Sequence, residues 1–351
     1  MSAFVLSLLL ASTAAAVRPL TPPATEFTPG AAWINAKPLS MALLHGRKVT
    51  VVAFINPTSV NSIRALPILQ AWFDRYALSQ LMVIGVLSPD LEMHRDPVWA
   101  RERLKRLGVE FPVMLDSDRR VWKGYSNEGW PAFYLVDHRG RVVYDHLGEG
   151  GYAEFEKELR SALGGLVDPD DLPAPVNAPE PTTALCGPST PDVLLGARSK
   201  KAVLPLDKDL SRRVSMIIEA RVGEVASRGR WNLERDGLRL DQANADQGNF
   251  LRVVYMGAQA LAVLAPPPGQ KKTARFFLKQ DDLWLHEGNA GKDVQFDDDG
   301  RSFVPVETAR LYDLVRDPDG RPHELYIIPE RKDSGVYGLS FPDSCTVTNI
   351  P

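Results

Sequence analysis

Two serines, Ser59 and Ser62, stand at the spacing of a Cys-x-x-Cys redox pair, where a buried strand gives way to a helix. An apolar run over residues 49–55 leads into this turn, and the pattern that follows predicts a helix over residues 59–76. A cysteine at a helix N-terminus is reactive because the helix stabilises its thiolate. A serine hydroxyl neither ionises near neutral pH nor forms a disulfide. The turn therefore has the position of a dithiol site without its thiols.

Ser59 has two other interpretations, a catalytic serine or an N-cap residue. A catalytic serine needs a general base and an oxyanion hole, but the chain has no Gly-x-Ser-x-Gly elbow and no histidine close to Ser59 in sequence. An N-cap serine only accepts a hydrogen bond from a free backbone N–H, and we favour this role, with Ser62 in the first turn. A thiol peroxidase would need a cysteine near Thr58 or Ser59, and residues 1–185 contain none. We assign no catalytic residue.

The rest of the composition excludes several classes of protein. The net charge of −3 leaves no basic excess for a nucleic-acid partner. The six histidines are scattered, and the two cysteines have no metal-binding spacing, so we expect no metal and no cofactor.

Those two cysteines, Cys186 and Cys345, flank the second half of the chain. We predict a disulfide between them, which closes a long loop and contributes about 4–5 kcal/mol to stability. The N-terminus supports an oxidising compartment, because residues 4–11 are apolar and residues 13–16 are small, as in a secretory signal. This apolar stretch is too short to span a bilayer, so we expect no transmembrane helix after signal cleavage. We expect export to the periplasm, the cell envelope or the extracellular space.

Apolar periodicity divides the chain into parts. We expect a signal peptide at 1–16, an extended leader at 17–31, an α/β domain at 32–166, a proline-rich linker at 167–191 and a β module at 192–345. In the α/β domain the predicted strands are 48–56, 81–87, 112–115, 131–137 and 141–146, and the predicted helices are 59–76, 97–107 and 151–163. This order predicts a mixed central sheet flanked by helices. Many short strands after residue 211 predict a β-sandwich or jelly roll.

Residues 32–163 resemble the TlpA/DipZ-like branch of thioredoxin-fold proteins. The resemblance rests on residues 48–54, on the stretch from Asn61 to Pro67, and on the run Gly-Trp-Pro-Ala-Phe-Tyr-Leu-Val-Asp at 129–137. It implies a cis peptide bond before Pro131. It also implies a groove lined by Asn56, Pro57, Trp130 and Pro131, which is a candidate peptide-binding surface. The alternative is that Trp130 packs against the helix at 59–76.

The second half resembles the module appended to DipZ-like thioredoxins, through residues 189–196, 231–233, 291–294, 310–315 and 338–341. That resemblance implies a carbohydrate-binding type of β-sandwich, so a glycan is a candidate ligand. Trp231, Trp284, Tyr312 and Tyr337 would form a stacking platform for it, although aromatics in strands are more often core residues.

Asp297, Asp298 and Asp299, with Asp293 before them, are candidate calcium ligands, but Asp-Gly at 299–300 favours a plain hairpin turn.

Taken together, the sequence predicts a redox-inactive, exported thioredoxin-like protein that binds a protein or peptide partner. The alternatives are a thioredoxin- or peroxiredoxin-type oxidoreductase of the envelope and a carbohydrate-binding protein.

Overall fold

The structure, a computed structural model, describes residues 21–180, 186–187, 189–199, 221–243, 248–269, 272–317, 319 and 321–345. The predicted signal peptide and the first residues of the predicted leader lie outside the described residues. The described part of the leader is extended and packs on the fold, because Pro23 bridges to Arg141 and Phe27 is buried against Trp33. Within the ranges given above, no helix is long and apolar enough to cross a membrane.

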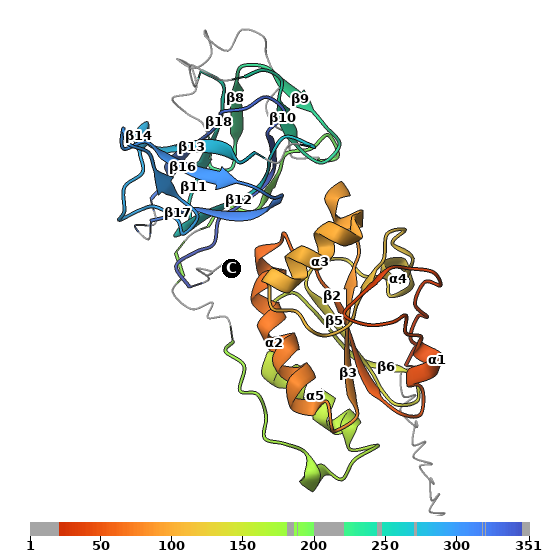
Figure 1. The fold of residues 1–351 in the computed structure, drawn as a ribbon. Helices are drawn as coiled ribbons and strands as arrows, with labels where there is room; N and C mark the ends of the chain where they lie inside the picture. The colour runs from red at the N-terminus through yellow and green to blue at the C-terminus, as the bar shows by residue number, and fades with distance from the viewer. Residues whose placement is uncertain are drawn as a thin grey trace, which may run out of the picture.

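The first part of the chain forms one mixed sheet with helices on both faces (Figure 1). The strands lie in the order β1-β4-β3-β2-β5-β6, with β2, β3 and β4 parallel and the other neighbours antiparallel. The strands are β1 (Trp33–Ile34), β2 (Val49–Phe54), β3 (Leu81–Leu87), β4 (Val113–Leu115), β5 (Ala132–Val136) and β6 (Val142–Leu147). The helices are α1 (Met41–Leu44), α2 (Val60–Tyr76), α3 (Pro97–Arg106), α4 (Arg120–Gly124) and α5 (Tyr152–Leu163), with a 3-10 turn, η1 (Glu92–Arg95), before α3.

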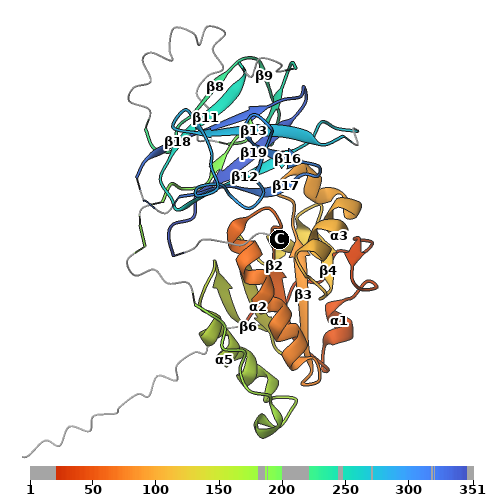
Figure 2. The same cartoon turned by 60° about the vertical axis from the view of Figure 1, so that its left-hand side comes forward.

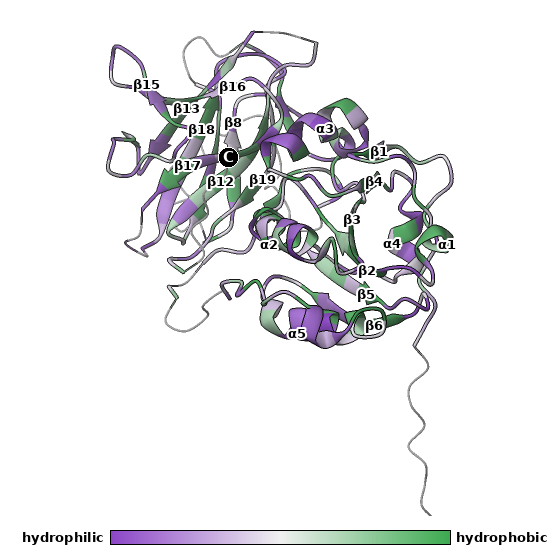
Figure 3. Ribbon diagram, turned by 60° about the horizontal axis from the view of Figure 1, so that its bottom comes forward, coloured by the Kyte–Doolittle hydropathy of each residue, from purple (hydrophilic) through white to green (hydrophobic). Residues whose placement is uncertain are grey.

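Strand β2 is buried along its whole length because helices cover both faces of the sheet. On one face, Trp72 of α2 stacks on Phe155 of α5 with 5.3 Å between ring centroids. On the other face, Phe54 meets Trp122 of α4 edge to face at 5.6 Å. The central strands are mainly hydrophobic, whereas α5 carries a hydrophilic outer side (Figure 3). This rigid sheet fixes the start of α2, where the two serines lie.

The second part of the chain is mostly β, as predicted, and consists of two antiparallel sheets around one core. One sheet has the order β17-β12-β19-β10-β9 with β7 also paired to β19, and the other has the order β15-β16-β13-β18-β11-β8 with β14 paired to β13. The strands are β7 (Val193–Leu194), β8 (Val225–Arg228), β9 (Trp231–Leu233), β10 (Leu238–Leu240), β11 (Phe250–Tyr255), β12 (Gln259–Ala265), β13 (Ala274–Gln280), β14 (Leu283–Trp284), β15 (Gln295–Phe296), β16 (Ser302–Val306), β17 (Arg310–Arg316), β18 (His323–Pro329) and β19 (Gly335–Ser340). We call this part the β module.

A disulfide joins Cys186 to Cys345, with 5.4 Å between the Cα atoms and a sequence separation of 159. This confirms the predicted pairing. The bond ties the segment that enters the β module to the segment that leaves it, and it uses both cysteines of the chain.

The proline-rich segment after α5 folds back along that helix. The Val176 N–H donates to the Glu156 carboxylate at 2.8 Å, and Arg160 donates to the carbonyl of Pro173. Leu172 and Ala178 pack against the core beneath α5. Within the described residues, this half of the segment is held in place rather than free.

Candidate functional site

The turn that carries the two serines, residues 56–62, keeps a defined shape without sulfur, and we call it the serine turn. Ser59 is the N-cap residue of α2, but its hydroxyl makes no capping hydrogen bond, so the predicted capping interaction is wrong. Ser62 is fully buried, and its hydroxyl accepts a hydrogen bond from the Asn56 N–H at 3.1 Å. The Ser62 hydroxyl thus closes the turn, whereas Ser59 lies at the start of α2 without a capping hydrogen bond.

A buried histidine, His94 of η1, contacts the serine turn, and no pattern in the sequence pointed to this role. Thr58 Oγ1 lies 2.8 Å from Asn56 Oδ1 and 3.1 Å from His94 Nε2. His94 Nδ1 accepts hydrogen bonds from the backbone N–H groups of Asp90 and Leu91, at 3.2 and 3.3 Å. The proton of the neutral ring is therefore on Nε2 and points at Thr58. With Nε2 as a donor, His94 cannot act as a base toward the threonine, so this trio is structural.

Burial, together with the charge of Arg198, lowers the pKa of His94 to about 3. The ring is neutral in the folded protein, whereas it takes up a proton below about pH 6.5 in the unfolded chain. The contribution of neutral His94 to the free energy of unfolding is therefore fully present above pH 6.5. It falls by about 1.4 kcal/mol per pH unit as the pH decreases toward 3.

We predict that the free energy of unfolding in urea falls by about 2 kcal/mol between pH 7 and pH 5 because of His94, and that His94→Gln removes this contribution. The histidine in β18, His323, has the opposite effect: burial lowers its pKa, but hydrogen bonds to Asp281 and Asp319 outweigh burial and raise it. The difference between wild type and His94→Gln isolates His94. Equal pH dependence of the two proteins would contradict the prediction.

Trp130 and Pro131 lie beside the serine turn, and the peptide bond between them is cis, as the resemblance implied. Trp130 is half-buried against Trp122 of α4, with 4.4 Å between ring centroids. The guanidinium of Arg119 lies 4.2 Å from the centroid of Trp122 and 5.4 Å from that of Trp130. Trp130 is therefore held rigidly at the side of the turn.

The β module lies across the serine turn and α3 (Figure 2). Trp99 of α3 donates its indole N–H to the carbonyl of Ala309 at 2.8 Å. An apolar cluster fills the contact, with Val60, Ile63 and Leu91 on one side and Leu261, Val263 and Leu311 on the other.

Ion pairs hold the edge of this contact. The Glu92 N–H donates to the carboxylate of Asp236 at 2.7 Å, across the two parts of the chain. Arg198, which follows β7, pairs with Asp236 at 3.1 Å and with Asp90 at 2.7 Å. Asp236 is only 8% exposed, so its carboxylate is held by these partners rather than by water.

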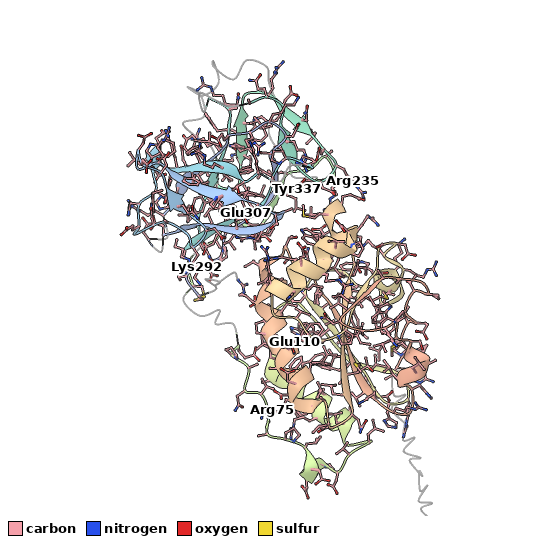
Figure 4. The ribbon with its side chains drawn as sticks, viewed as in Figure 1. Arg75, Glu110, Arg235, Lys292, Glu307 and Tyr337 are labelled. Carbon is pink, nitrogen blue, oxygen red and sulfur yellow. A yellow bond between two sulfur atoms is a disulfide. The ribbon has the colours of Figure 1, made fainter. Side chains whose placement is uncertain are left out.

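A cavity of about 320 Å³ remains between the serine turn and the β module. Asn56, Ser59 and Trp130 line it from the first part of the chain, and Tyr337 and Ser340 of β19 line it from the second. Tyr337 lies on the side of the β module that faces α3 (Figure 4). Two of the predicted groove residues, Pro57 and Pro131, are buried and do not line the cavity. The predicted groove is thus partly covered by the β module of the same chain.

Within the ranges that the structure describes, the other candidate residues have partners in the protein itself. Asp297 accepts hydrogen bonds from the Asp299 and Arg301 N–H groups in the β15–β16 turn, and Asp293 pairs with Arg310 at 2.6 Å, as expected of a plain acidic turn. The proposed stacking platform is not assembled on one exposed face. Trp231, Tyr312 and Tyr337 are buried in the sheet of β9, β17 and β19, while Trp284 lies on the other sheet.

The sheet order, the turn at the start of α2 and the adjacent cis-proline define a thioredoxin-like fold in the first part of the chain. No protein-family model matches the chain. Protein DipZ of Mycobacterium tuberculosis is 32% identical over 167 residues, which cover 47% of this chain and 24% of DipZ, so the match spans about a quarter of that relative. Thiol-disulfide oxidoreductase YkuV of Bacillus subtilis is 28% identical over 144 residues, covering 41% of this chain and 96% of YkuV.

Among solved structures, a thioredoxin-like protein in its oxidised form is 28% identical, with a TM-score of 0.38. The match covers 42% of this chain and 99% of the chain of that protein. This chain is thus similar over part of its length to DipZ and to the thiol-disulfide oxidoreductase YkuV. Both cysteines of the whole chain, Cys186 and Cys345, are in the disulfide of the β module, so no thiol is available to the serine turn.

Proposed function

We propose that this is an exported, redox-inactive thioredoxin-like protein that binds an extended peptide segment of a partner in the cavity at the serine turn. The observation that carries the proposal is the preserved geometry of the turn without any thiol. Asn56, Thr58 and Ser62 are held by buried hydrogen bonds, while Ser59 faces a cavity of about 320 Å³. Pockets of about 300–1,000 Å³ suit small ligands or a few residues of peptide. The Cys186–Cys345 disulfide supports an oxidising compartment.

The competing function is that of a thiol-disulfide oxidoreductase, the activity named for YkuV. We predict that the full chain reduces insulin with dithiothreitol no faster than dithiothreitol alone, and that Ser59→Ala does not change this rate. The paired variant Ser59→Cys/Ser62→Cys is the positive control, because α2 would lower the pKa of a thiol at position 59. Turnover by the wild type above its Ser59→Ala variant would overturn the proposal of redox inactivity.

Peptide binding is tested separately, by selecting displayed peptides on the folded full chain. Ser59→Trp, which fills the cavity, is expected to abolish binding of the selected peptides while leaving the circular dichroism spectrum unchanged. Asp298→Asn, in the exposed β15–β16 turn, is the matched control and should bind as wild type does. Peptides that bind Ser59→Trp equally well would place their site elsewhere.

A further inference from the structure

The two parts of the cavity lining differ in polarity. Its lining includes two carboxylates, Asp90 and Asp192, and no lysine, arginine or histidine among the described residues. Asp90 is neutralised by Arg198 at 2.7 Å. Asp192, directly before β7, makes no ion pair within the part of the chain that the structure describes. The lining of the cavity therefore holds one uncompensated negative charge.

Within the described residues, no cationic side chain forms an ion pair with the carboxylate of Asp192. Burial of the carboxyl group raises the pKa of Asp192, while a hydrogen bond with Ser340 and the charge of Arg64 act to lower it. Arg64 is already engaged by Glu149, with 2.6 Å between Nε and Oε1. The residue as a whole is exposed, although its carboxyl group is partly desolvated, and it lines the cavity. A cation bound there would gain an anion that the protein has not neutralised.

The opposite wall has the reverse polarity. Ser59 stands at the start of α2, a helix of 17 residues, and its hydroxyl does not cap the helix. The first N–H groups of a helix have no partner inside it and, with the helix dipole, favour a negative or carbonyl oxygen. Ser59 and Asn61 of this first turn line the same cavity as Asp192. A ligand that fits both parts of the lining thus carries an ammonium group and a carbonyl oxygen.

We propose that the cavity captures the free N-terminal end of a peptide. The α-ammonium group lies against Asp192, and the first carbonyl oxygen lies against the Ser59 hydroxyl and the first turn of α2. Trp130 and Tyr337 provide the apolar walls for the first side chain. This inference rests on the proposed function and gives the class of peptide end that the site accepts.

The test compares two tripeptide amides, trialanine amide with a free N-terminus and its N-acetyl counterpart, titrated into the full-length protein by calorimetry and amide NMR. The free peptide is expected to bind about tenfold tighter or more, because acetylation removes one charge pair. Its binding should weaken as the pH rises through about 8, where the α-ammonium group loses its proton. Asp192→Asn should remove the preference for the free peptide, and Asp298→Asn should retain it.

Equal binding of the two peptides, or a preference that survives Asp192→Asn, would overturn the inference. So would the absence of saturable binding by the free peptide. If displayed peptides bind through internal segments and Ser59→Trp blocks them, the proposed function stands and this inference fails. If no peptide of either kind binds, both fail.

Discussion

Replacing Cys186 and Cys345 together with serine is expected to lower the free energy of unfolding of the β module by about 4–5 kcal/mol. The bond closes a loop with a sequence separation of 159, so its loss returns a large chain entropy to the unfolded state. With a urea dependence of about 2 kcal/mol per M, the unfolding midpoint should move down by about 2 M.

The measurement is a urea titration followed by tryptophan fluorescence and far-ultraviolet circular dichroism. Wild type treated with a reductant should match the double variant, because both lack the same bond. A thiol assay on the native, unreduced protein should find no reactive thiol. A midpoint for the double variant within about 0.3 M of wild type would show that the folded module does not depend on this closure.

Asp236→Ala is expected to weaken the docking of the β module on the serine turn by about 2–4 kcal/mol. The substitution removes the acceptor of the Glu92 N–H and one of the two carboxylates that pair with Arg198. These groups lie at a buried edge, and a partner left unpaired there pays its full desolvation cost. Asp90 would keep its pair with Arg198, so the contact weakens without losing every ion pair.

Small-angle X-ray scattering should report a larger radius of gyration for Asp236→Ala. Trypsin should cleave this variant faster after Arg198, because Arg198 loses one of its two carboxylate partners. Asp298→Ala, which removes a carboxylate from an exposed turn far from this edge in sequence, is the matched control. Since both parts retain their own cores, thermal unfolding of each should persist. An unchanged radius and cleavage rate would mean that the apolar cluster alone holds the contact.

Most of the first part of the fold follows from local sequence patterns. The strands and helices predicted there all occur, with ends that differ by one or two residues, because each carries a clear apolar period. The short elements β1, α1 and α4 were not predicted, since a few residues give no period to detect. Among the site predictions, the cis bond before Pro131 and the Cys186–Cys345 disulfide are confirmed.

What the sequence could not reveal is the surface on which the two parts meet. Ile63 and Leu261 are both apolar, and each is indistinguishable in sequence from a residue of its own core. Only their packing in a separate cluster shows that they face one another. His94 was missed for a similar reason: its role depends on backbone N–H groups and on Thr58, which is far from it in sequence. Interactions between distant segments leave no periodic trace.

The fold of the proline-rich segment along α5 has a consequence for how strongly the β module must bind its docking surface. Glu180 accepts a hydrogen bond from the Ala153 N–H of α5, and Cys186 is held by its disulfide, so only residues 181–185 separate the two anchored points in sequence. A tether of this length sets an effective concentration of the order of millimolar. Contacts too weak to join two separate molecules are then sufficient to keep the module closed over the serine turn. A ligand could compete for that surface without first breaking a tight complex.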